Sequence, residues 1–228
     1  MFLPCRSTQA EYFDLPGRAD SETGQAFRDL DRINRFFQFA RPFHDSLPRW
    51  LGEERCRRLD ILDVGAGTGL LARTLSAWAT ERGWHWRITS LDANPVGLRL
   101  GEAEPSVVGN ALHLPFPDES FDLVIGSQMT HHLRDEEVVQ HLREGWRVSR
   151  DALMVSDMHR NAGLYLLLWF STRLLGVCQS VKEDALISVK RGFRCDELLC
   201  HAKQAGVLLP KAWLYYGTRI ILQARKQL

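Results

Sequence analysis

The sequence predicts an α/β fold with one mostly parallel, seven-stranded sheet that ends in an antiparallel hairpin. Short apolar strands alternate with helices along residues 58–157, and a glycine-rich turn follows the first strand. Two further strands close the chain almost without a connection. Alternation of this kind builds a parallel sheet with crossover connections. So short a final join is compatible only with antiparallel neighbours.

Residues 22–58 are predicted to be helical, because apolar side chains recur there at spacings of three and four residues. They are Phe27, Leu30, Ile33, Phe36 and Phe37. We expect residues 1–58 to form an N-terminal helical cap on a core spanning residues 59–228, the whole being one structural domain.

Five strands are expected in the core, each a short apolar run bounded by turn residues. They are RLDILDV (58–64), WRITSLD (86–92), PSVVG (105–109), FDLVIGS (121–127) and DALMVSD (151–157). Helices are predicted over residues 70–83 and from about 135 to 148. A helix over 195–206 then leads to the hairpin strands KAWLYYG (211–217) and TRIILQARK (218–226).

An inserted segment, residues 158–194, carries an apolar helix at NAGLYLLLWFSTRLLGVC (161–178). The helix is apolar nearly all round, so we expect it to be buried as a lid over a ligand cavity. A homodimer interface or contact with a membrane surface remains open. It is too short, and carries Arg173, so no membrane span is expected.

The overall composition is that of an ordinary globular protein, with 45% hydrophobic and 25% charged residues. The net charge is +1 and no basic patch with interleaved aromatics is evident, so nucleic acid is not an expected partner. Five scattered cysteines without a CxxC pair indicate neither a zinc site nor a disulfide framework. The N-terminus does not resemble a signal peptide, and we expect a cytoplasmic protein.

The turn LDVGAGTG (62–69) lies where open α/β sheets bind ligands, beyond the carboxyl end of the first strand. Gly65 and Gly67 permit a tight turn and close approach of a ligand. Leu70 occupies the position of the third glycine in a dinucleotide fingerprint, which disfavours a nicotinamide dehydrogenase. Asp92 ends the second strand, where a carboxylate can accept hydrogen bonds from ribose hydroxyls.

The ordered series DVGAGTG, LDANP and GNALHLPFPDESFDLVIGSQMTHHL resembles the signature motifs of the class I S-adenosylmethionine-dependent methyltransferases, over residues 59–157. The resemblance implies a Rossmann-like sheet and S-adenosyl-L-methionine as cofactor. It implies that the following residues bind the cofactor: Asp63, Gly65, Ala66 and Gly67 at the methionine part, Asp92 at the ribose, Ala93, Asn110 and Ala111 at the adenine, and Ser127 and Gln128 at the end of the fourth strand. Many relatives carry Asp where Asn110 stands, but an amide oxygen can still accept a hydrogen bond.

His131 and His132 follow the fourth strand, and Asp157 ends the fifth, so the carboxyl edge of the sheet could bring them together. A hydroxyl acceptor of a methyl group benefits from a general base. We expect one histidine, preferably His131, to be that base, with Asp157 orienting it. The alternative is that the pair only packs against the following helix. No metal site is expected, because adjacent residues on a turn rarely converge on one ion and no third ligand is evident.

The series SDMHR, LLLWF, TRLL and ISVKRGF is more loosely similar to bacterial methyltransferases associated with type III polyketide phenolic lipids and quinones. With the apolar lid, this resemblance implies O-methylation of a small hydrophobic phenol, quinol or polyketide-like molecule in natural product biosynthesis. Two alternatives stay open. They are C-methylation of a quinone precursor and a non-catalytic module that binds S-adenosylmethionine.

Overall fold

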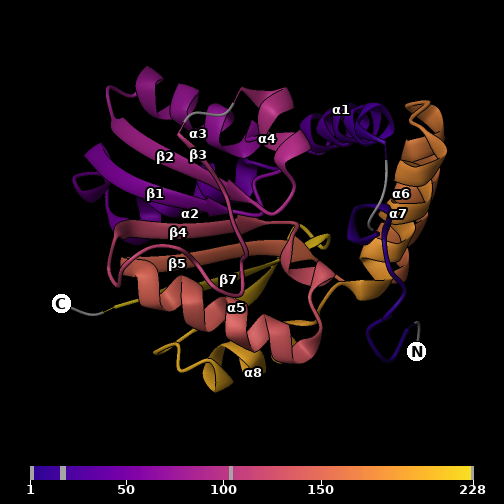
Figure 1. The fold of residues 1–228 in the computed structure, drawn as a ribbon. Helices are drawn as coiled ribbons and strands as arrows, with labels where there is room; N and C mark the ends of the chain where they lie inside the picture. Colours follow the sequence, from indigo (N-terminus) through magenta and orange to yellow (C-terminus); the bar gives the residue numbers. More distant parts are fainter. Residues whose placement is uncertain (1–2, 16–18, 103–104, 227–228) are drawn as a thin grey trace.

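The computed structural model describes residues 3–15, 19–102 and 105–226, which build one seven-stranded sheet between two layers of helices (Figure 1). The strand order is β3-β2-β1-β4-β5-β7-β6. Strands β1 to β5 run parallel to their neighbours among themselves, whereas β7 runs antiparallel to both β5 and β6. The predicted fold class is therefore confirmed. The strands are β1 (Arg58–Val64), β2 (His85–Asp92), β3 (Ser106–Val108), β4 (Phe121–Ser127), β5 (Ser149–Met158), β6 (Lys211–Tyr215) and β7 (Arg219–Arg225).

The central strands are apolar along their length because helices cover both of their faces. Helices α2 (Arg41–Leu51) and α3 (Leu70–Glu81) pack on one face, around Ile61 and Leu123. Helices α5 (Asp135–Val148) and α8 (Cys195–Gln204) pack on the other, around Leu62. The apolar clusters on both faces fix the position of the sheet, and the residues at its carboxyl edge are positioned with it.

The N-terminal region is divided into separate helices. Helix α1 (Asp20–Phe36) ends at a turn, α2 begins at Arg41, and a short 3-10 helix η2 (Arg55–Arg57) leads into β1. Continuous helix over residues 22–58 was therefore too broad a prediction. Helix α1 lies beyond the carboxyl edge of the sheet and packs against α4 (Pro95–Gly101), away from α2 (Figure 1).

Two helices, rather than the single one predicted, occupy residues 158–194. Helices α6 (Ala162–Leu174) and α7 (Gln179–Arg191) lie side by side at the same edge as α1 (Figure 1). Leu164 and Leu168 of α6 are buried against α7. The other face of α6 is exposed in this chain, and it is the face that a homodimer interface or a membrane surface would cover. The exposed apolar side chains are Leu166, Leu167, Trp169, Phe170 and Leu174.

Among the described residues, no helix has the length and apolar character needed to cross a bilayer.

The N-terminal segment, residues 3–15, runs along α7 and includes the 3-10 helix η1 (Tyr12–Asp14). The Ser7 N–H donates to the Lys190 carbonyl at 2.9 Å, and the Tyr12 N–H donates to the Asp184 carboxylate at 2.8 Å. These contacts bring a segment distant in sequence to the edge where β1, β4 and β5 end.

Candidate active site

The glycine turn between β1 and α3 has a backbone that favours glycine. Gly65, Gly67 and Gly69 adopt φ values of +74°, +56° and +70°. A Cβ at Gly65 would come within 2.2 Å of the Met129 side chain. The N–H groups of Gly65 and Ala66 both donate to the Leu91 carbonyl. The turn is thereby fixed between β1 and β2 at the mouth of a cavity.

Asp92 anchors the second side of this turn. Its Oδ2 accepts a hydrogen bond from the Gly67 N–H and its Oδ1 one from the Asn94 N–H, both at 2.7 Å. Burial raises the pKa of Asp92, although these donors act in the opposite direction. Residues 92–96 line the second cavity, and the Asp92 carboxylate can accept further hydrogen bonds there.

Asp63, at the end of β1, is 1% exposed, and its Oδ2 has no hydrogen-bond partner among the described residues. Burial, with a smaller contribution from the charge of Asp92, raises the pKa of Asp63 to about 7. A buried carboxyl oxygen without a donor is costly. The ammonium group of a bound amino acid would satisfy it, so this position fits the methionine part of the expected cofactor.

Two adjoining cavities lie over the turn, and most of the predicted residues line them. The first is lined by Asp63, Gly65, Ala66, Gly67, Ser127, Gln128, His131 and His132. The second is lined by Asp92 and Ala93 and shares Gly65, Gly67, Gln128 and His132 with the first. Asn110 and Ala111 line neither cavity, and the Asn110 side chain accepts a hydrogen bond from the Leu112 N–H. Their role at the adenine stays a prediction.

His131 and Asp157 meet as the sequence predicts. The His131 Nδ1 lies 2.6 Å from Asp157 Oδ1, and its backbone N–H donates to Oδ2 at 3.1 Å. Burial alone would raise the pKa of Asp157, but His131 and the Met158 N–H outweigh it and lower the pKa, so the group is a carboxylate. Asp157 contacts Nδ1, so Nε2 is the ring nitrogen of His131 that faces Glu11, which also lines this cavity.

His132 has a carboxylate partner of its own. Its Nδ1 lies 2.8 Å from Asp14 Oδ1, which comes from η1, 118 residues away. Burial lowers the pKa of His132, but Glu11 and Asp14 outweigh that effect and raise the pKa to about 9. Burial likewise opposes the shift of Asp14, whose pKa is nevertheless lowered by His132, the Glu11 N–H and Arg191.

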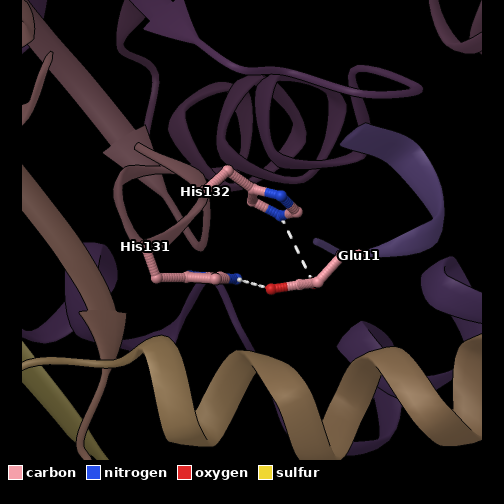
Figure 2. A group of neighbouring side chains, drawn as sticks. All are labelled: Glu11, His131 and His132. Atoms are coloured by element: carbon pink, nitrogen blue, oxygen red, sulfur yellow. Dashed lines mark ion pairs between the residues drawn. The ribbon is translucent and has the colours of Figure 1, made fainter. Parts of the chain in front are cut away.

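Glu11, which the sequence does not reveal as a site residue, lies beside His131 and His132 (Figure 2). Its carboxylate lies opposite both imidazoles, with Oε1 at 3.7 Å from His131 Nε2 and Oε2 at 3.6 Å from His132 Nε2. It is 2% exposed and lines the first cavity. A single acidic residue in an irregular segment has no local pattern that predicts such a position.

Glu11, His131 and His132 form a group whose candidate ligand atoms lie within 4.8 Å of one another in the described chain. The centroids of the two imidazole rings lie 4.5 Å apart, and the ring planes are tilted by 32° to each other. A metal ion binds along the lone pair of an imidazole nitrogen, in the plane of the ring. Glu11 therefore supplies the third candidate ligand that the sequence did not show, so the lack of a third ligand no longer argues against a metal site.

The raised pKa of His132 gives a pH dependence of stability. The protonated imidazole is favoured in the folded state, so its contribution is complete below the unfolded pKa of about 6.5 and is lost as the pH rises through about 9. We expect the free energy of unfolding in urea to fall between pH 6.5 and 9. His132→Gln should flatten this slope, whereas His85→Gln, at an exposed histidine, should leave it unchanged. A wild-type slope retained by His132→Gln would contradict the assignment.

Comparison with known proteins finds similarity over part of the chain. The family described as "Methyltransferase domain" matches residues 62–152. A demethylmenaquinone methyltransferase from Roseiflexus sp. (strain RS-1) is 35% identical over 92 residues, which cover 39% of this chain and 37% of the relative. A ubiquinone/menaquinone biosynthesis C-methyltransferase from Bartonella quintana (strain Toulouse) is 30% identical over 136 residues, 53% of this chain and 49% of the relative. The chain thus spans half or less of the length of these relatives.

Solved structures share the fold over a larger part of the chain. An S-adenosylmethionine-dependent methyltransferase from Aquifex aeolicus superposes with a TM-score of 0.60 at 15% identity, covering 92% of this chain and 99% of the other. Human N-acetylserotonin methyltransferase in complex with S-adenosylmethionine gives a TM-score of 0.63 at 16% identity, covering 92% of this chain and 57% of the other. At these identities the likeness concerns the fold.

Proposed function

We propose that this protein, whose residues 62–152 match the family described as "Methyltransferase domain", is an S-adenosylmethionine-dependent enzyme. Its proposed acceptor is a hydroxyl oxygen of a small, apolar aromatic molecule such as a phenol or quinol. The observation that carries the proposal is the His131–Asp157 pair, which presents Nε2 of His131 to the cavity beside the glycine turn. A proton acceptor at this place suits the methylation of oxygen, because the hydroxyl must lose its proton.

The cofactor site is assigned as follows. S-adenosylmethionine supplies an electrophilic methyl group when bound. The backbone of the turn from Gly65 to Gly67 approaches its methionine part, Asp63 pairs with the ammonium group, and Asp92 accepts hydrogen bonds from the ribose. Ala93, Ser127 and Gln128 line the same cavities and complete the assignment.

The acceptor site is assigned to the part of the first cavity that lies between the sheet edge and the helices α1, α6 and α7. Apolar side chains from these helices line it, including Phe27, Ile33, Leu168 and Val181. They suit an apolar ring, and Leu168 gives the insertion 158–194 its proposed role as a lid. In the same way we assign residues 1–58 as a cap, through Phe27 and Ile33.

Methyl transfer is a displacement at carbon, for which the protein provides proximity and orientation. For an acceptor hydroxyl held beside the methyl group that bound S-adenosylmethionine would supply, Nε2 of His131 would take up the hydroxyl proton as the oxygen is methylated. Asp157 holds the ring in place and stabilises the imidazolium that results. His132, paired with Asp14, borders the same space.

C-methylation of a quinone precursor is the second candidate. It is favoured by similarity to the ubiquinone/menaquinone biosynthesis C-methyltransferase from Bartonella quintana. A ring carbon made nucleophilic by an ionised phenol would use the same base. The nature of the product distinguishes the two, because a methyl group on oxygen and one on an aromatic carbon have different NMR shifts.

The test begins with the cofactor. Calorimetry with S-adenosylhomocysteine and with NAD should show binding of the first alone, and binding of NAD alone would contradict the proposal. Incubation with methyl-labelled S-adenosylmethionine and alkylphenols or alkylquinols should then place the label on oxygen. A protein that binds the cofactor and transfers no label to any of these acceptors would favour the non-catalytic alternative.

Asp92→Ala is expected to weaken binding of S-adenosylhomocysteine by at least about tenfold, because it removes both the acceptor for the ribose and the brace of the Gly67 N–H. Calorimetry measures the change. Asp60→Ala, on β1 in the same sheet but facing Arg87 at the surface, is the matched control and should bind normally. Equal affinity of Asp92→Ala and the wild type would contradict the assignment.

A further inference from the structure

The two oxygens of the Glu11 carboxylate differ in what they contact. Oε2 lies 2.7 Å from the hydroxyl oxygen of Ser188, on α7, which donates to it. Oε1 has no hydrogen-bond partner among the described residues, although the side chain is 2% exposed. The carboxylate is thus fixed at one oxygen, while the other is turned toward His131 (Figure 2).

The described residues around Oε1 supply the positive charge of Arg191 but no hydrogen-bond donor close enough to bond to it. Arg191 Nε lies 3.7 Å away and donates instead to the His131 carbonyl at 2.9 Å. His132 balances further negative charge through Oε2. What Oε1 lacks is therefore a neutral hydrogen-bond donor rather than another cation. A buried acceptor left in this way is destabilising, and a ligand that supplies the donor is favoured.

The proposed base and Oε1 of Glu11 are both acceptors, and both border the first cavity. Asp157 holds the Nδ1 proton of His131, so its Nε2 offers a lone pair. Only 3.7 Å separates the two atoms. One hydroxyl carries one proton and cannot donate to both, so two donors close together are needed to satisfy the pair.

We propose, on the basis of the function above, that Glu11 binds a second hydroxyl of the acceptor, adjacent to the one that is methylated. The acceptor is then an aromatic ring with two neighbouring hydroxyls. The first donates to His131 and loses its proton, whereas the second donates to Glu11 and keeps it. Glu11 thereby determines which hydroxyl faces the methyl group, since the reverse orientation places the proton acceptor opposite the wrong oxygen.

Equilibrium binding tests this without methyl transfer. The protein loaded with S-adenosylhomocysteine is titrated with 4-pentylcatechol, 4-pentylresorcinol and 4-pentylphenol, which carry the same chain. A hydrogen bond to a charged acceptor predicts that the catechol binds about 10- to 100-fold more tightly than the phenol. The resorcinol, with its hydroxyls one carbon farther apart, should resemble the phenol.

Glu11→Ala should reduce the preference in affinity for 4-pentylcatechol over 4-pentylphenol to about threefold or less. Glu11→Gln, which keeps the size of the side chain, should reduce this preference as well. Affinity for S-adenosylhomocysteine should stay unchanged in both variants and reports that they are folded. Glu53→Gln, at an exposed glutamate, is the control and should keep the full preference.

Equal binding of the three probes by the wild type, no binding of any, or a preference that survives in both Glu11 variants would each overturn the inference. Tight binding of the resorcinol would overturn the adjacency of the two hydroxyls. A catechol preference that depends on Glu11, in a protein that never transfers its methyl group, would instead support the inference and contradict the proposed activity.

Discussion

Replacing His131 by glutamine is expected to lower kcat for methyl transfer to a phenolic acceptor by about 10²- to 10⁴-fold, the usual contribution of a general base. Glutamine can occupy similar space and still contact Asp157, but it cannot take up a proton. Binding of S-adenosylhomocysteine should change less than twofold, because the assigned contacts to the cofactor come from other residues. Initial rates with labelled S-adenosylmethionine, together with calorimetry, provide the two measurements.

A second variant separates a base from a residue that only packs. Asp157→Asn should lower kcat as well, because an amide no longer fixes the Nδ1 proton. The double variant should be little worse than His131→Gln alone, since the two residues act as a unit. Full activity of both single variants would contradict the assignment.

Arg160→Met is expected to lower the free energy of unfolding by about 3–5 kcal/mol, the usual effect of breaking a buried ion pair. The side chain of Arg160 is 0% exposed, and its guanidinium pairs with both carboxylate oxygens of Glu197, at 2.6 and 3.0 Å. It also donates to the carbonyls of Leu3, Pro4 and Gly192. Removing it leaves the Glu197 carboxylate without its buried partner at the start of α8.

Urea unfolding monitored by circular dichroism measures this loss. Arg134→Met is the matched control, because Arg134 forms an exposed pair with Glu137 on α5 and its loss should leave the free energy of unfolding close to that of the wild type. Arg160 also connects the N-terminal segment to the end of α7. Its loss should therefore weaken the packing of that segment, which carries Glu11. Equal stability of the two variants would show that the buried pair contributes no more than a surface one.

Much of the site could be predicted from short stretches of sequence. The glycine turn, Asp92, the histidine pair and Asp157 all follow the carboxyl ends of predicted strands. Parallel strands end at one edge of a sheet, so knowledge of the strand order was enough to bring His131 and Asp157 together. Asn110 and Ala111 were assigned by resemblance alone, and in the structure they lie outside the lining of both cavities.

The helical additions were less accessible to sequence reasoning. Helix α7 mixes charged and apolar residues without a clear stripe, and it was not predicted. It acquires its orientation from long-range partners, such as the contact of Ser188 with Glu11, 177 residues away. The exposed face of α6 likewise could not be predicted. Apolar residues lie on all sides of this helix, so the sequence does not distinguish the side that packs on the protein from the side that faces solvent.

The sequence by itself therefore determined the sheet, the glycine turn with Asp92, and the nearness of a histidine to Asp157. The local pattern of alternating strands and helices predicts the strands and the turns that follow them. Because the strands are parallel, their carboxyl ends and the residues that follow them lie at one edge of the sheet. Only the tertiary structure decided that Glu11 and Asp14 face the histidines. Those contacts depend on how the N-terminal segment packs on α7, and no local periodicity specifies packing between segments so far apart in the chain.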